Sequence, residues 1–178
     1  MKILFINGSP NKNGNTVSLA KFLLDSKPYE TLNLVDYKIY SYGQNYSDDE
    51  FEKVVEKMKN SEIIIIGSPM YWHSMSGAIR NLLDRFYGYV REKEFSEKDL
   101  YFIFQGAAPT KNQLAAGEYT IERFSELYGL KYKGMVSDEK EAKALGLTVS
   151  AAEIQDILKA GVHPLLRQTP FQNPQTGN

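Results

Sequence analysis

The sequence contains no cysteine among its 178 residues. This absence excludes disulfide bonds, thiolate-bound zinc, iron–sulfur clusters and a cysteine nucleophile. Histidine is almost as scarce, because His73 and His163 are the only two in the chain. A histidine-rich metal site is therefore not expected, and we predict a functional site without a metal.

An excess of charge of either sign is also lacking. The 21 Lys and Arg residues nearly balance the 22 Asp and Glu residues, which gives a formal net charge of -1. With no basic cluster along the chain, a nucleic-acid partner is not expected. No apolar run approaches the roughly 20 residues of a membrane span, and no signal-peptide pattern is present. We therefore expect a soluble, cytoplasmic protein that binds neither nucleic acid nor a membrane.

Short apolar blocks predict the strands of the fold. Blocks such as residues 3–6, 63–66 and 100–104 are bounded by polar residues and are typical of strands buried on both faces. Two further segments are weaker candidates. The five expected strands are Ile3–Ile6, Tyr29–Val35, Glu62–Gly67, Leu100–Phe104 and Lys131–Val136.

Helices are indicated between these strands by apolar residues at helical spacing and by capping residues. Strands and helices that alternate in this way predict an α/β fold, with a doubly wound parallel sheet, helices on both faces and right-handed crossovers. The expected helices are Thr16–Leu24, residues 48–60 with Ser47 and Glu50 as capping box, one capped by Ser74 or Ser76, one from Thr110 with Gln113, and one from Ser150 with Glu153.

The length of the chain fits one domain, which we place at residues 1–163. His163 would end its last helix in a structural role. Residues 164–178 have no periodicity and three prolines, so we expect an irregular arm there. We expect this arm to extend over a neighbouring surface, that of a dimer partner.

A loop with the sequence GSPNKNGNT follows the first expected strand and leads into the first helix. It lacks the lysine of a nucleotide P-loop and the three glycines of a dinucleotide fingerprint. Its neutral donors, together with the N–H groups of the helix N-terminus, suit a single phosphate, as in a mononucleotide. The alternative is a tight loop in which the same residues act only in turns and caps. The candidate donors are Ser9, Asn11, Asn13, Asn15 and Thr16.

Two other loops would meet the first at the carboxyl ends of the strands, where doubly wound sheets bind their ligands. The second, SPMYWHSMSG, begins where Pro69 is expected to end the strand, and its Met70, Tyr71 and Trp72 could line a pocket for a planar ring. Alternatively, Tyr71 and Trp72 are anchors of the core or of a subunit interface. The third loop, QGAAPTKNQ, contributes Gln105 and Gly106.

GSPNKNGNT followed by SPMYWHSMSGAIRNLLDRF resembles the NAD(P)H-dependent FMN reductase branch of the flavodoxin-like family. The resemblance implies a five-stranded parallel sheet of order 2-1-3-4-5, bound FMN, NADPH or NADH as electron donor, a homodimer, and reduction of flavins, quinones or related small acceptors. Asn11 stands where many relatives have arginine. By position, Ser9, Asn15 and Thr16 would contact the phosphate, Pro69, Met70, Tyr71 and Trp72 would border the flavin ring, and Gln105 and Gly106 would lie in the third loop.

With FMN bound, the flavin would carry the chemistry, and few catalytic side chains would be needed. His73 is a candidate proton donor to the reduced acceptor, although a loop histidine with a local hydrogen bond is the commoner case. Two alternatives remain. One is an electron-transfer flavodoxin without its own nicotinamide site, although a net charge of -1 does not suggest the strongly acidic face of such carriers. The other is a flavin-free binding protein with the same fold.

Overall fold

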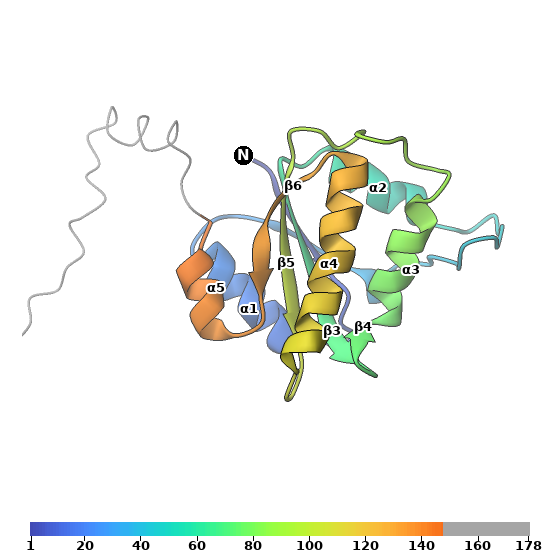
Figure 1. Cartoon of the computed structure of the whole chain (residues 1–178). Helices are drawn as coiled ribbons and strands as arrows, with labels where there is room; N and C mark the ends of the chain where they lie inside the picture. Colours follow the sequence, from blue (N-terminus) through green and yellow to red (C-terminus); the bar gives the residue numbers. More distant parts are fainter. Residues whose placement is uncertain (148–178) are drawn as a thin grey trace, which may run out of the picture. The chain divides into compact units, whose positions relative to one another are not determined.

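Five parallel strands form the centre of the structure, a computed structural model that describes residues 1–147 (Figure 1). Their spatial order is β2-β1-β3-β5-β6, which is the predicted order 2-1-3-4-5 when the parallel strands alone are counted. A sixth strand, β4 (Ser74–Met75), pairs antiparallel with β3, so the expectation of five strands was one short. The parallel strands are β1 (Ile3–Asn7), β2 (Glu30–Asn33), β3 (Ile63–Tyr71), β5 (Asp99–Gln105) and β6 (Lys131–Val136).

Helices cover both faces of the sheet (Figure 1). Side chains of a strand alternate between faces, and Leu4 and Ile6 of β1 accordingly belong to the core cluster that includes residues of α2, α3 and α4. Phe5, between them, is equally buried but lies outside this cluster. The helices are α1 (Asn15–Leu24), α2 (Phe51–Lys59), α3 (Gly77–Phe86), α4 (Lys111–Tyr128) and α5 (Glu139–Leu145), with a 3₁₀ turn η1 (Leu34–Asp36) after β2.

Two of the predicted helix starts are confirmed by their caps. Ser76 caps α3, because its hydroxyl accepts the N–H of Ile79. Thr110 and Gln113 form a complete capping box at the start of α4. Both pairs are local in sequence, so the pattern alone was sufficient to locate them.

The predicted start of α2 was wrong. The helix begins at Phe51, and its N-cap is Glu50, whose side chain makes no capping hydrogen bond. The capping box expected from Ser47 and Glu50 is not formed. Instead, the Asp49 carboxylate accepts the N–H of Phe51 at 2.8 Å. An aspartate two residues before a helical N–H competes effectively with a serine farther away, which places the start of the helix later than expected.

β3 is longer than predicted, because it continues through Pro69 to Tyr71. Its partner β1 ends where Asn7 pairs with Gly67, whereas the pairing with β5 continues to Pro69 and Gln105. Beyond Gly67 the strand therefore has a parallel neighbour on one side only, and a residue without an N–H group is tolerated there. The extension carries Met70 and Tyr71 beyond the carboxyl end of the parallel sheet.

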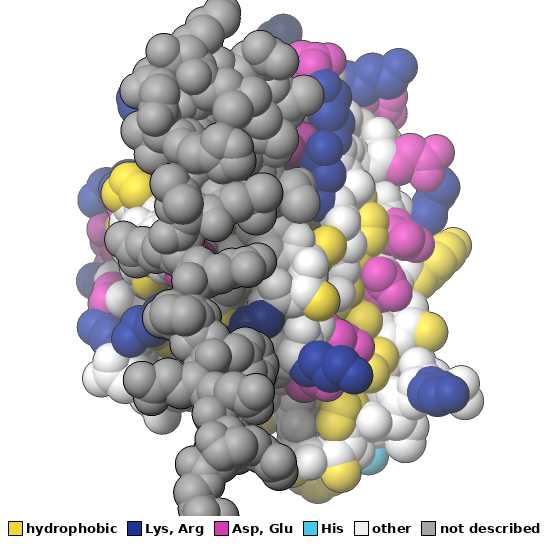
Figure 2. Space-filling view, turned by 90° about the vertical axis from the view of Figure 1, so that its left-hand side faces the viewer, with side chains coloured by type: hydrophobic (Ala, Val, Ile, Leu, Met, Phe, Trp, Pro, Cys, Tyr) yellow, Lys and Arg dark blue, Asp and Glu magenta, His cyan; other side chains and the backbone are white. Residues whose placement is uncertain are grey.

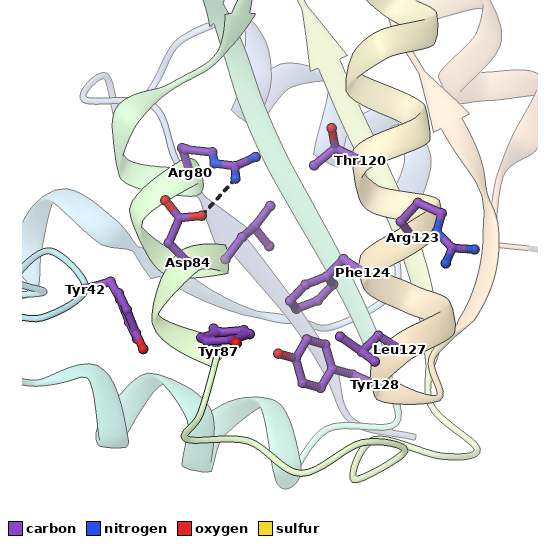
Figure 3. A pocket seen from close by; sticks show the side chains of 10 residues that line it. Tyr42, Arg80, Asp84, Tyr87, Thr120, Arg123, Phe124, Leu127 and Tyr128 are labelled. Atoms are coloured by element: carbon purple, nitrogen blue, oxygen red, sulfur yellow. Dashed lines mark ion pairs between the residues drawn. The ribbon is translucent and has the colours of Figure 1, made fainter.

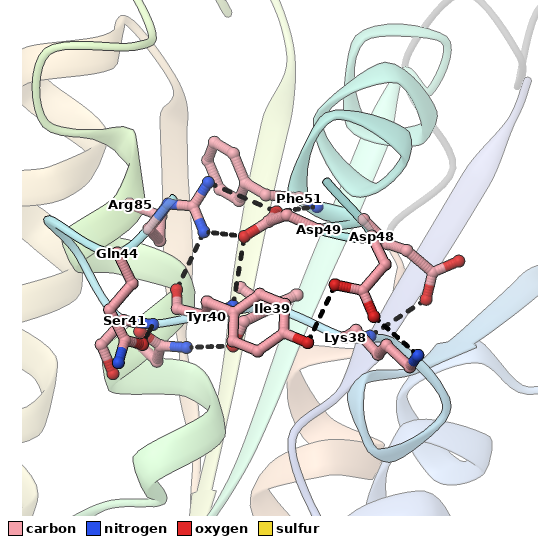
Figure 4. A network of polar contacts seen from close by, with 11 residues as sticks. Lys38, Ile39, Tyr40, Ser41, Gln44, Asp48, Asp49, Phe51 and Arg85 are labelled. Carbon is pink, nitrogen blue, oxygen red and sulfur yellow. Dashed lines mark hydrogen bonds and ion pairs between the residues drawn. The ribbon is translucent and has the colours of Figure 1, made fainter. Parts of the chain in front are cut away.

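A polar network attaches the connection between η1 and α2 to α3 (Figure 4). Arg85 forms an ion pair of 2.5 Å with Asp49 and donates to the Tyr40 carbonyl at 2.8 Å, and the Asn81 amide donates to the Ile39 carbonyl at 2.7 Å. Partial burial alone would raise the pKa of Asp49. The hydrogen bonds from Arg85 and from backbone N–H groups outweigh that effect, so the pKa of this carboxyl is lowered.

The chain divides into two units, Met1–Gly146 and Leu147–Asn178. The predicted helix from Ser150 with Glu153, the structural role of His163, the domain end at residue 163 and the arm over 164–178 lie outside the described residues. Helix α5, with Asp138 as its cap, was not predicted. Within residues 1–147, no helix has the length and apolar character to cross a membrane.

Candidate functional site

The three candidate loops follow β1, β3 and β5, which are neighbours in the sheet, and direct contacts connect them. The Gln105 side-chain amide donates to the Thr16 hydroxyl at 3.1 Å, which connects the third loop to the start of α1. The Gly8 N–H donates to the Gly67 carbonyl at 2.8 Å. At Gly106, a Cβ atom would lie 3.1 Å from that of Met70, so the second and third loops are also in contact.

Side chains of the first loop fold it into consecutive turns. The N–H groups of Ser9, Asn11 and Asn13 donate to the side chains of Asn7, Ser9 and Asn11, respectively, at 2.9 to 3.1 Å. The prediction that these residues act as turn formers is thus confirmed for part of the loop. It does not exclude a phosphate site, because the turns leave other donors available.

Those remaining donors gather at the start of α1. Its N-cap is Gly14, without a side-chain cap, and its first turn contains no acidic residue. The N–H groups of Gly14, Asn15 and Thr16 have no acceptor within residues 1–147. The hydroxyls of Ser9 and Thr16 accept hydrogen bonds from Asn11 and Gln105, so each can still donate its own proton. This donor set at the positive end of a helix fits a phosphate group.

Two contacts at this end of the sheet were not found from the sequence. The Lys12 ammonium forms an ion pair of 2.6 Å with Asp36 in η1, with both side chains about half exposed. The buried Asn7 donates from its amide to the Asn33 side chain at 3.0 Å, which ties the end of β1 to the end of β2. Both pairs join residues far apart in the chain, and no local pattern would have revealed them.

Buried serines connect the second loop to the first. The Ser68 hydroxyl accepts the N–H of Ser76 at 2.9 Å and donates to the Pro69 carbonyl at 2.9 Å. The Ser76 hydroxyl in turn donates to the Gly8 carbonyl at 2.9 Å. The first turn of α3 thereby fixes the position of the backbone from which the first loop departs.

The second loop is a β-hairpin with a two-residue turn. Met70 pairs with Met75 and Tyr71 with Ser74, so Trp72 and His73 form the turn, and both have positive φ angles, 48° and 66°. This is the backbone of a type I′ turn, which usually takes asparagine and glycine. Trp72 is 95 % exposed and Tyr71 49 % exposed, so the core alternative is wrong for Trp72, and the subunit-interface alternative stays a prediction.

The structure therefore brings most of the predicted site residues into three connected loops. Asn13 and Asn15 are exposed, Ser9 and Thr16 are almost fully buried, and Pro69, Met70, Gln105 and Gly106 line the end of the sheet. His73 contacts Gln113 at the start of α4, a residue that was predicted only as a cap. Within the described residues, no cluster of three or more metal-ligating side chains occurs.

A groove of about 430 Å³ lies elsewhere, between α3 and α4 (Figure 3). Apolar and aromatic side chains line most of it, and an ion pair of 2.9 Å between Arg80 and Asp84 flanks it. None of its lining residues belongs to the three loops. The lining includes Tyr42, Tyr87, Phe124, Leu127 and Tyr128.

A family model for NADPH-dependent FMN reductases matches residues 1–130. The chain belongs to this family. It is 28% identical over 157 residues to a Bacillus subtilis protein, YwqN, that bears the name of an NAD(P)H-dependent FMN-containing oxidoreductase; the match covers 78% of this chain and 85% of that protein. It is 32% identical over 106 residues to an NADPH azoreductase of Bacillus sp. strain OY1-2, covering 58% and 57% of the two chains.

Among solved structures, the Trp repressor binding protein of Bacillus subtilis superposes with a TM-score of 0.67 at 25% identity, over 81% of this chain and 98% of that chain. The flavodoxin-like fold expected from the resemblance is therefore confirmed. Membership of the family makes the chain an FMN-dependent NAD(P)H oxidoreductase, and the flavodoxin alternative is not favoured. The uncapped, donor-rich start of α1 suits the phosphate of this cofactor.

Proposed function

We propose that this oxidoreductase holds FMN across its three connected loops and reduces flavins, quinones or related small acceptors by a ping-pong reaction. The observation that carries the proposal is the contact of Gln105 with Thr16, which joins the third loop to the donor-rich start of α1. When bound, FMN supplies the capacity to accept a hydride from a nicotinamide and to reduce an acceptor.

The first loop would hold the phosphate end of the cofactor. The hydroxyls of Ser9 and Thr16 and the N–H groups at Asn15 and Thr16 would donate to phosphate oxygens, with Asn11 and Asn13 shaping the loop. Lys12 already has an acidic partner in Asp36, so the site relies on neutral donors and the helix N-terminus.

The second and third loops would hold the ring end. Pro69, Met70 and Tyr71 continue β3 beyond the sheet, and Gln105 and Gly106 lie beside them. Trp72, at the tip of the hairpin, would border the opening. One opening serves both the nicotinamide and the acceptor in turn, which is the reason to expect ping-pong kinetics.

We also propose a homodimer, with the α3 and α4 groove as the contact between two copies. The large exposed side chains Tyr42, Tyr87 and Leu127 line it, and ion pairs such as Arg80 with Asp84 supply charges of both signs. A surface with charges of both signs can be complementary to a second copy of itself across a two-fold axis.

A cytoplasmic location is proposed as well, because that compartment supplies reduced nicotinamides.

Anaerobic titration of the purified FMN protein with NADPH and NADH tests the proposed function. Flavin absorbance should bleach with one of the nicotinamides, and adding a quinone should restore it. Reduction only by a separate reductase would instead support the electron carrier. Figure 2 supports the enzyme, because acidic and basic side chains are interspersed over the coloured part of the face that it shows.

A further inference from the structure

Gln113 makes two contacts at the start of α4, and the first fixes the orientation of its amide. In the capping box, the Gln113 Oε1 atom accepts the N–H of Thr110 at 2.8 Å, and the Gln113 N–H donates to the Thr110 hydroxyl at 3.3 Å. A main-chain N–H requires an acceptor, so the oxygen of the Gln113 amide faces Thr110. The NH₂ group of the amide must then face away from the cap.

The second contact joins this NH₂ group to the hairpin. Gln113 Nε2 lies against the Nδ1 atom of His73, in the turn between β3 and β4. An amide NH₂ group can only donate, so Nδ1 of His73 must accept and cannot carry a proton. The contact therefore favours the tautomer of the imidazole ring that has its proton on Nε2.

The backbone restricts the same ring further. His73 has a φ of 66° and follows Trp72, whose φ is 48°. These two residues form the whole turn, because Tyr71 already pairs with Ser74. The contact with Gln113 connects the tip of the second loop to the helix that follows the third loop. The side chain of His73 is exposed, and its contact at Nδ1 orients the ring and with it the remaining N–H.

We propose that Gln113 is a positioning residue, which holds His73 as the Nε2–H tautomer so that this N–H donates a hydrogen bond to a carbonyl oxygen of a quinone-type acceptor. The proposal rests on the proposed function. The acceptor gains two electrons and one proton as a hydride, which reduced FMN would supply as it is oxidised, and the second proton comes from solvent water. Neutral His73 thus stabilises the negative charge that develops on the oxygen, and it does not act as the acid.

The tautomer is tested by ¹⁵N NMR of the FMN-bound protein with labelled histidine, in which the His73 signals are identified by their loss in His73→Asn. The wild type should show a protonated Nε2 and a bare Nδ1. Gln113→Glu keeps an oxygen for Thr110 but presents a second acceptor to the ring, so it should move the proton to Nδ1. A tautomer that is the same in the wild type, Gln113→Glu and Gln113→Ala would overturn the proposal.

The role in turnover is tested by stopped-flow measurement of the two half-reactions. His73→Ala and Gln113→Glu should slow reoxidation by a quinone roughly 10- to 100-fold, the effect of losing a hydrogen bond to a charged group. Flavin reduction by the nicotinamide and FMN affinity should change less than about twofold, since neither involves this N–H. Asn112→Ala, which removes an exposed amide next to Gln113, is the matched control and should leave both half-reactions unchanged.

His73→Asn provides a rescue, because asparagine tolerates positive φ and still donates from its amide. It should restore quinone reoxidation to within about threefold of the wild-type rate if the donor is what matters. A rate as low as that of His73→Ala would count against the proposal, as would equal slowing of both half-reactions. Absence of flavin reduction by either nicotinamide would instead refute the proposed function, whereas the NMR result stands independently of it.

Discussion

The Ser76 hydroxyl donates a 2.9 Å hydrogen bond to the carbonyl of Gly8, and the two buried residues are 68 positions apart in the sequence. The same hydroxyl accepts the N–H of Ile79 as the cap of α3. One oxygen thus stabilises a helix start and holds the backbone that leads into the loop proposed to bind the phosphate. A residue without any contact to the cofactor is therefore expected to influence its binding.

Replacement of Ser76 by alanine should remove both bonds. We expect a loss of about 1 to 2 kcal/mol in the free energy of unfolding from the lost cap and the unsatisfied Gly8 carbonyl. FMN affinity should fall as well, measured by quenching of flavin fluorescence. Ser76→Thr keeps the hydroxyl and is the control. Lower stability with unchanged FMN affinity would show that Ser76 does not position the loop.

Ser9→Ala and Thr16→Val should each weaken FMN binding by about 1.5 to 3 kcal/mol, because each removes a hydroxyl donor to a charged phosphate. Thr16→Val preserves the shape of a side chain that is 1 % exposed. Isothermal titration of the apoprotein with FMN measures the effect. Ser18→Ala, an exposed hydroxyl on the same helix, should leave affinity unchanged. Wild-type affinity in both site variants would refute the assignment of the phosphate site.

Trp72→Ala should lower quinone turnover more than FMN occupancy. The indole is 95 % exposed at the tip of the hairpin, so its removal opens no cavity in the core. Steady-state kinetics with a quinone, together with the flavin content of the purified variant, separate the two effects. Loss of flavin in proportion to activity would indicate that Trp72 serves the cofactor instead of the acceptor.

The pair of Arg85 and Asp49 should make stability depend on pH. Burial opposes ionisation of Asp49, but its hydrogen bonds lower the pKa of the carboxyl below its ordinary value, so the folded state favours the charged form. This contribution is present above the ordinary aspartate pKa of about 4 and is lost as pH falls through the lower folded value. Asp49→Asn should therefore destabilise more at pH 7 than at pH 3, as measured by urea unfolding. An equal difference at both pH values would contradict this linkage.

Leu127→Glu should dissociate the proposed homodimer. The side chain is 44 % exposed and lines the groove between α3 and α4, where a carboxylate would be costly to bury against a second copy. Sedimentation velocity gives the oligomeric state. Asn112→Glu makes the same change of charge on α4 outside the groove and should leave the dimer intact. A dimer that persists in Leu127→Glu would place the interface elsewhere.

Local patterns in the sequence predicted most of the fold. Apolar blocks located the parallel strands, and the caps at Ser76 and Thr110 lie within a few residues of the groups that they bind. The extension of β3 through Pro69 was missed because it depends on where β1 ends, which is a property of the assembled sheet. The start of α2 was misplaced because the nearer carboxylate of Asp49 outcompeted Ser47.

The candidate site was predictable as three loops but not as a set of contacts. Strand order brings the loops together, and the family resemblance supplied that order. Gln105 and Thr16, which are in contact, are 89 residues apart in the sequence. Lys12 and Asp36, which form an ion pair, are 24 residues apart. No local or periodic pattern in the sequence indicates either pair. Such pairs become visible only when the crossovers have placed the strand ends side by side.

The turn at Trp72 and His73 has a consequence for evolution and engineering. Two bulky residues with positive φ occupy positions where asparagine and glycine would relieve the backbone, so the hairpin tip is less stable than its geometry allows. Substituting Asn-Gly there should raise the melting temperature while removing the side chains assigned to turnover. Natural proteins are rarely as stable as their fold permits. A screen for thermostable variants of this chain is therefore expected to select substitutions in this turn. Selection for heat resistance alone is then expected to yield a more robust protein that is a poorer catalyst.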